Sequence, residues 1–231
     1  MNSTPFLYVA FKGLNDSLRG TLDGTKIESI KETIHHFAIA SAVACVASGV
    51  LPGIAGVVAG LTQAGFVWAT YVQINKTLGI SMSEHTAKFL GTAIVTNIVA
   101  GAGTLLLTYA GAALLSFIPI AGQVASMAIN GALGFIVIYV ASVIYLKLIS
   151  KLIQPDGTLN VAENEDTKQV IKEVIKESNI KEIIKEGRNA YKQAKADGSL
   201  DRAKNSLKCP RCGAEVNSEY KFCMNCGAPL K

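Results

Sequence analysis

Two long stretches of the chain contain no Asp, Glu, Lys or Arg, and a short polar segment separates them. The first stretch covers residues 37–75 and the second covers residues 89–146. Each is long enough for two helices, and each contains a proline near its middle, Pro52 in VLPG and Pro119 in FIPIAG. Proline lacks an amide donor and clashes with the preceding turn, so a helix is expected to end there. The pattern therefore predicts four helices in two hairpins, over residues 26–50, 53–78, 83–117 and 120–153.

An amphipathic segment precedes these helices. From about Thr4 to Arg19, apolar residues recur at the spacing of one helix face, with polar residues on the other face. This N-terminal helix either lies on lipid or packs on the helical domain, and its sequence is compatible with both. The apolar positions are Leu7, Phe11, Leu14 and Leu18.

A second amphipathic segment follows Pro155. Lys and Glu alternate along it, and Asn179 with Glu182 forms a capping box between two helices. Because the charges recur at i,i+4 separations, we expect a solvated helical stalk, followed by a short tether. Its apolar stripe consists of Val170, Val174, Ile183, Ile184 and Tyr191.

Four of the five cysteines lie in the last 23 residues, as two Cys-x-x-Cys pairs with ten residues between them. Four thiolates satisfy the tetrahedral coordination of Zn²⁺, and each Cys-x-x-Cys turn directs two sulfurs toward one point. A redox dithiol or a disulfide pair is the alternative. Since four protein ligands leave no open coordination position, the zinc is expected to be structural. The predicted ligands are Cys209, Cys212, Cys223 and Cys226.

The residues around these cysteines support the same interpretation. Gly213 and Gly227 follow the second cysteine of each pair, where the chain turns back, while Tyr220 and Phe222 supply apolar cover for the metal. The segment resembles the short bacterial and archaeal zinc ribbon of the form CPxCG…FCxxCG. Because few basic residues accompany it, we expect protein contacts and no nucleic acid.

These elements together predict an all-α fold: a four-helix hydrophobic domain of two hairpins, a charged helical stalk and a small zinc ribbon. The expected parts are an N-terminal amphipathic helix (1–24), a hydrophobic helical membrane domain (25–154), the stalk and linker (155–207) and the ribbon (208–231).

The composition favours a membrane. Half of the residues are hydrophobic and 17% are charged, whereas ordinary domains carry about 25% charge. A span needs about 20 apolar residues; the last three of the four predicted helices meet this length and the first is short. Lysines lie at three sites, before, between and after the hairpins, so the positive-inside rule places both termini in the cytosol. We expect the inner membrane of a prokaryote, with the proline turns crossing it or ending inside it as wedges.

Glycines are frequent in these helices, including Gly101, Gly131 and Gly134. In lipid, small residues let helix backbones approach closely, so tight helix packing is expected, ahead of a pore or gate. The isolated Cys45 is expected to be a buried small apolar residue.

Residues 34–152 resemble the helical domain of unknown function in YcjF-type proteins and behind small bacterial GTP-binding domains. The resemblance rests on the Pro/Gly-rich first hairpin, the INKTLGI turn at Ile74–Ile80 and the IPIAG turn at Ile118–Gly122. It implies a membrane-associated module coupled to a GTPase. No Gly-x-x-x-x-Gly-Lys-Ser/Thr motif occurs, so the GTPase would be a separate partner.

No catalytic constellation is present, and we expect no enzyme activity. His35, His36 and His85 are expected at the membrane interface. Two functions stay open: a membrane-inserted scaffold, adaptor or bilayer-shaping protein, and a soluble or switchable helical assembly that inserts as a pore-former. The expected partners are the lipid bilayer, a protein bound through the ribbon, and further copies of the chain.

Overall fold

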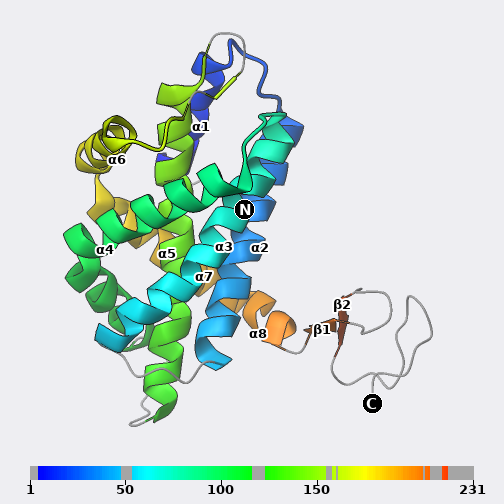
Figure 1. Cartoon of the computed structure of the whole chain (residues 1–231). Coiled ribbons are helices and arrows are strands. Elements are labelled where there is room, and N and C mark those ends of the chain that lie inside the picture. The colour runs from blue at the N-terminus through cyan, green and yellow to red at the C-terminus, as the bar shows by residue number, and fades with distance from the viewer. Residues whose placement is uncertain are drawn as a thin grey trace.

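The structure, a computed structural model, describes residues 5–47, 54–115, 123–154, 158–159, 161–204, 206–208 and 215–217. Within these ranges the chain forms eight helices and one small pair of strands (Figure 1). The helices are α1 (Pro5–Ser17), α2 (Gly24–Ala47), α3 (Ile54–Leu78), α4 (Glu84–Leu115), α5 (Gln123–Leu152), α6 (Glu165–Glu177), α7 (Ile180–Ala196) and α8 (Ser199–Lys204), and the strands are β1 (Ser206–Lys208) and β2 (Glu215–Asn217). The all-α class is confirmed, and α2 to α5 begin and end within three residues of the predicted bounds.

Helix α5 is the core of the helical body. Between residues 130 and 149 every side chain is buried except Leu133 and Lys147, which are partly buried. The other helices surround α5, with α1, α2, α3, α4, α6 and α7 all packed against it. A helix that is apolar on all sides has no face to offer to water, so burial on every side is the arrangement that its sequence requires.

Helix α1 packs on this body, which decides between the two alternatives for the N-terminal segment. Leu7, Phe11 and Leu14 are buried in the common core. The first turn is fixed because the Phe6 backbone N–H donates to Oε1 of Glu186 in α7, at 3.1 Å. The last turn is fixed because the Ser17 hydroxyl donates to the carbonyl of Ser150 in α5, at 2.7 Å.

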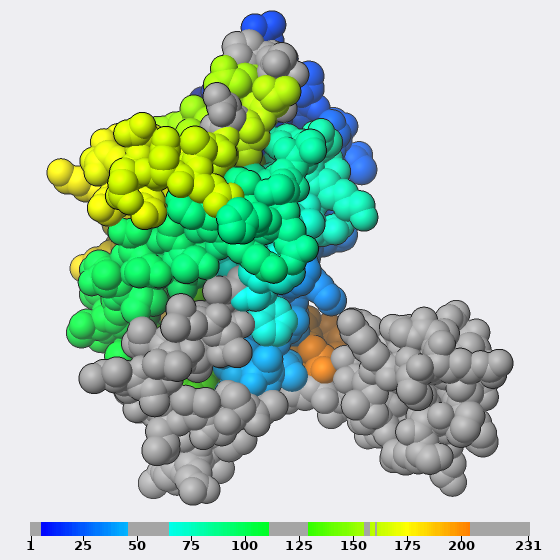
Figure 2. All heavy atoms as spheres, viewed as in Figure 1, coloured from blue at the N-terminus to red at the C-terminus, as the bar shows by residue number. Residues whose placement is uncertain are grey.

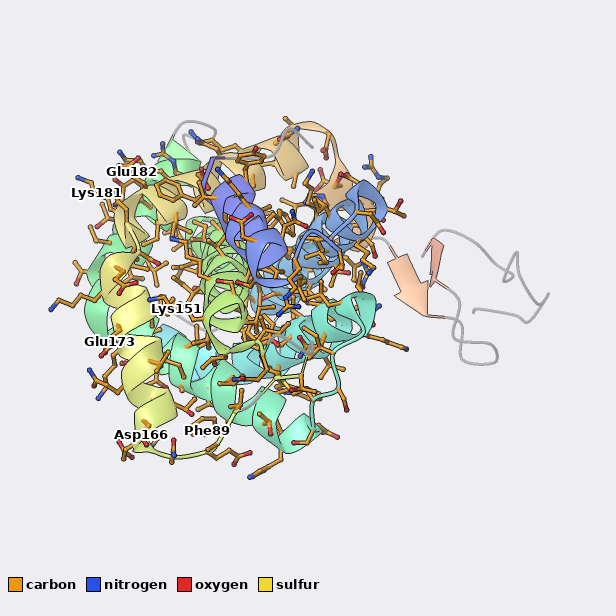
Figure 3. All side chains as sticks on the ribbon, turned by 90° about the horizontal axis from the view of Figure 1, so that it is seen from above. Phe89, Lys151, Asp166, Glu173, Lys181 and Glu182 are labelled. Carbon is orange, nitrogen blue, oxygen red and sulfur yellow. The ribbon has the colours of Figure 1, made fainter. Side chains whose placement is uncertain are left out.

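Helices α6 and α7 also lie against the body, and this differs from the predicted solvated stalk. Both pack on α4 and α5, and α8 packs on α2 and α7. The predicted stripe is the reason: most of it is buried, at Val174, Ile183, Ile184 and Tyr191. The charged residues occupy the opposite side, where Figure 3 shows Asp166, Glu173, Lys181 and Glu182 at the periphery. The predicted capping by Asn179 is confirmed, since its side chain accepts the backbone N–H of Glu182.

A buried polar network joins α3 to α5. The rings of Tyr71 and Tyr145 stack with centroids 3.8 Å apart. The Tyr145 hydroxyl donates to Oδ1 of Asn75 at 2.7 Å, and the Tyr71 hydroxyl donates to the carbonyl of Ala141 at 3.0 Å. Each of these buried hydroxyls thus has the partner that its removal from water requires.

Helices α2 and α5 approach closely at Gly134. A Cβ at this position would lie 3.0 Å from both the Ser41 carbonyl oxygen and Cys45 Sγ. The prediction of tight packing around glycines is confirmed here. At Gly101 the surroundings are different, because nothing lies within 4 Å of the corresponding Cβ.

Gly134→Ala is expected to destabilise the protein by about 1–3 kcal/mol, since the new methyl group would push against backbone that cannot move without separating α2 from α5. Gly101→Ala is the matched control and is expected to stabilise by up to about 1 kcal/mol, because alanine is favoured over glycine inside an unobstructed helix. Urea unfolding followed by circular dichroism measures both values. Equal effects of the two substitutions would contradict the close approach.

Candidate metal centre

A short antiparallel hairpin begins the C-terminal ribbon. Strand β1 pairs with β2 in the register Ser206 to Asn217, Leu207 to Val216 and Lys208 to Glu215. The last of these pairs encloses residues 209–214, which hold the first Cys-x-x-Cys. The hairpin therefore brings the chain on either side of this first pair together.

The four predicted ligands, Cys209, Cys212, Cys223 and Cys226, lie outside the described residues. Their chemistry fits zinc: four thiolate donors complete a tetrahedron, and both pairs have the spacing of a zinc knuckle. When bound, Zn²⁺ supplies the cross-link that so small a unit needs in order to fold.

The described part of the chain offers no rival metal site. Among its residues no three His, Cys, Asp or Glu side chains converge. Cys45 is buried on α2 beside Gly134, which confirms its prediction as a small core residue.

The histidines lie in protein environments that the sequence did not anticipate. The ring of His35 in α2 packs edge-on against Phe135 of α5, with centroids 6.1 Å apart. Its Nδ1 is buried and has no hydrogen-bond partner within the described residues. Burial lowers the pKa of His35 below its ordinary value, and the Asp197 carboxylate opposes this shift. His85 at the start of α4 is exposed and lies 2.7 Å from Oε2 of Glu163.

Two of the described helices are long and apolar enough to cross a membrane. They are Glu84–Ala110, with mean hydropathy 1.7, and Ile129–Leu152, with mean hydropathy 2.3. Length and composition are the only grounds for this, and a core helix of a water-soluble protein meets the same standard. The most apolar 18-residue window of the first is 39% buried by protein and that of the second is 89% buried.

Comparison with known proteins identifies one family. Residues 208–230 match the zinc-ribbon domain, and this match implies a zinc-binding site. No family match supports the resemblance of residues 34–152 to the YcjF-type and GTPase-associated domain. No curated protein and no solved structure matches the chain.

Cys212→Ser is expected to weaken zinc binding strongly, because three thiolates leave the fourth tetrahedral position to water. The metal content of the purified protein measures this, with wild type carrying an equimolar amount of zinc. The matched control is Cys45→Ser, which alters a thiol of the helical body and should leave the zinc content unchanged. Helical circular dichroism should be the same for wild type and Cys212→Ser, since the described helices all precede the ribbon. A zinc content of Cys212→Ser equal to that of wild type, also after exposure to a chelator, would contradict the assignment.

Proposed function

We propose that the protein is a non-enzymatic adaptor that inserts one end of its helical body shallowly into a membrane and presents the zinc ribbon to a protein partner. The observation that carries this proposal is the distribution of charge along the bundle. Charged helices cover one part of the body, whereas the end of α2, the start of α3, the end of α4 and the start of α5 carry no charged residue.

The boundary between the two parts is at the contact between α2 and α5. His35 meets Phe135 there, and Tyr191 of α7 packs on the other side of Phe135, with ring centroids 5.6 Å apart. Arg188 of the same helix lies 5.3 Å from the ring of Tyr109 in α4. Arg188 of α7 therefore places a charged residue beside α4 at this level.

Beyond this level the helices are uncharged. From Phe135 back to Gln123, and from His35 forward to Ala47, each helix continues for 12 residues without Asp, Glu, Lys or Arg. The end of α4 and the start of α3 lie at the same end of the bundle (Figure 1). At 1.5 Å per residue, 12 residues extend about 18 Å. The hydrocarbon core of a bilayer is about 30 Å thick, so this end suits one leaflet and is too short to cross both.

The exposed side of α4 supports the same orientation. Its outward residues are uncharged from Phe89 to the end of the helix, and Leu105 and Leu107 are more than one-third exposed. In Figure 2 this surface, in green, lies below the charged α6, in yellow. Shallow insertion also keeps α1 and α8, the helix that precedes the ribbon, on one side of the membrane. This agrees with both termini in the cytosol of a prokaryotic cell.

Reversible deep insertion is a second candidate, and the burial of α5 favours it. This helix is long enough to span a bilayer, yet protein covers it. A spanning form would require α1, α6 and α7 to leave α5, because their charged faces cannot enter hydrocarbon at low cost. Such a rearrangement is the switchable assembly predicted as the alternative function.

The ribbon supplies the second half of the proposal. Zinc ribbons are protein-interaction or metal-binding modules, and this one follows α8, which packs on the helical body. A partner bound by the ribbon would thus be held beside the membrane. A GTPase is one candidate partner and rests on the resemblance alone, while self-association of the chain stays a prediction.

The sole tryptophan, Trp68, distinguishes shallow from deep insertion. It lies in α3 about 21 Å from the start of that helix at Ile54, and Lys88 Nζ lies 5.0 Å from its ring centroid. Shallow insertion is expected to leave Trp68 fluorescence unquenched by lipids brominated deep in the acyl chains. In a Trp68→Phe background, Val58→Trp near the start of α3 should be quenched, and Tyr8→Trp on the exposed face of α1 should not.

Each outcome decides between the forms. Quenching of Trp68 itself would contradict shallow insertion and favour the spanning form. Failure of the wild-type protein to float with vesicles of anionic phospholipid would overturn the membrane part of the proposal and leave the zinc ribbon unaffected.

A further inference from the structure

A hollow of about 320 Å³ lies between α1 and α2, at a distance from the uncharged end of the bundle. Three apolar residues form its floor: Phe11, Leu22 and Ile27. Three polar ones stand at its rim: Tyr8, Lys12 and Lys31. This hollow lies wholly within the described part of the chain, and neither the proposed membrane contact nor the ribbon uses it.

The floor is held in place by contacts of the protein itself. Phe11 and Leu22 are 3% and 6% exposed and belong to the common core. Asn15, which also lines the hollow, accepts the Leu22 backbone N–H at its Oδ1, at 3.1 Å, and so fixes the turn between α1 and α2. The hollow is therefore formed before any ligand arrives, as most small-molecule sites are.

The rim is cationic. Lys31 has a side chain only 12% exposed, and its Nζ lies 3.1 Å from Oε2 of Glu28, a more exposed residue. Lys12 is exposed, and within the described residues no carboxylate forms an ion pair with it. No acidic residue lines the hollow. Two lysines thus line the hollow together with the exposed Tyr8, and the Lys31 ammonium is paired with Glu28 whereas the Lys12 ammonium has no ion pair among the described residues.

We propose that this hollow binds a free monocarboxylate with a single medium-length acyl chain. The carboxylate would accept charge-assisted hydrogen bonds from Lys12 and Lys31, and the acyl chain would lie against the partly buried Ile27 and the exposed ring of Tyr8. The volume decides the class of ligand. The volume of the hollow is near the lower limit for small-molecule sites, about 300 Å³. A hollow of this size suits one short acyl chain and not the two long chains of a phospholipid. This proposal does not rest on the membrane association proposed above.

Isothermal titration of the full-length, zinc-loaded protein with decanoate, below the concentration at which decanoate forms micelles, tests the site. Saturable binding is expected for wild type. Lys12→Met keeps most of the apolar stem and removes the charge, so it should raise Kd by about threefold to tenfold. Lys31→Met should raise it similarly, and the double variant should raise it further. Decanol, which has the same chain without the charge, should bind more weakly than decanoate.

Lys181→Met is the matched control, because Lys181 is an exposed lysine on the outer side of α7 (Figure 3). It should leave Kd unchanged. No saturable binding to wild type would overturn the proposal, as would an unchanged Kd in both Lys12→Met and Lys31→Met, or an equal loss in Lys181→Met. The urea midpoint of each variant shows whether it is folded. Should Lys31→Met unfold, Lys12→Met decides alone, since Lys12 is exposed and has no structural partner in the described chain. The outcome of vesicle flotation, which tests the membrane association, does not depend on whether decanoate binds.

Discussion

The structure depends on covering α5 on every side. This helix offers no polar face, and each large apolar side chain left in water would cost about 1.5–3 kcal/mol relative to burial. Six other helices supply the cover, and they come from both sides of α5 in the sequence. The helices that carry the charges, α6 and α7, therefore belong both to the core and to the surface of the helical body. Their apolar stripes complete the cover, and their outer faces give the body its contact with water.

The same constraint links the two ends of the chain. Glu186 of α7 accepts the first free N–H of α1, so a helix that follows α5 in the sequence caps the first described helix. Lys147 of α5 lies 5.8 Å from the Phe6 ring and donates to Ser178 between α6 and α7, at 3.2 Å. Because α1, α5 and α7 meet at these residues, α1 cannot leave the body without disturbing the helices that precede the ribbon. Any rearrangement on a membrane would thus reach both termini together.

The four long helices were predictable because local features mark their limits: two prolines divide the uncharged stretches, and a short polar segment separates them. The zinc ligands stay a prediction that rests on an equally local signal, the fixed spacing of four cysteines. The packing partners of the amphipathic helices could not be predicted. A stripe such as Ile183, Ile184 and Tyr191 shows which face of the helix is apolar. It does not show whether lipid, another chain or α5 buries that face. The hollow beside Lys12 was missed because its lining comes from two segments that only the fold brings together. Likewise, nothing in the pattern distinguishes a helix buried by lipid from α5, which protein buries.

The central claim is that the chain itself, without lipid, buries α5. Hydrogen exchange of the full-length protein in detergent-free buffer, read by mass spectrometry, tests this most directly. Peptides from residues 130–149 should exchange most slowly of all, with protection close to that of global unfolding, while those from the outer turns of α6 exchange faster. Rapid exchange along α5, or a chain that stays dispersed only when detergent is present, would contradict the account.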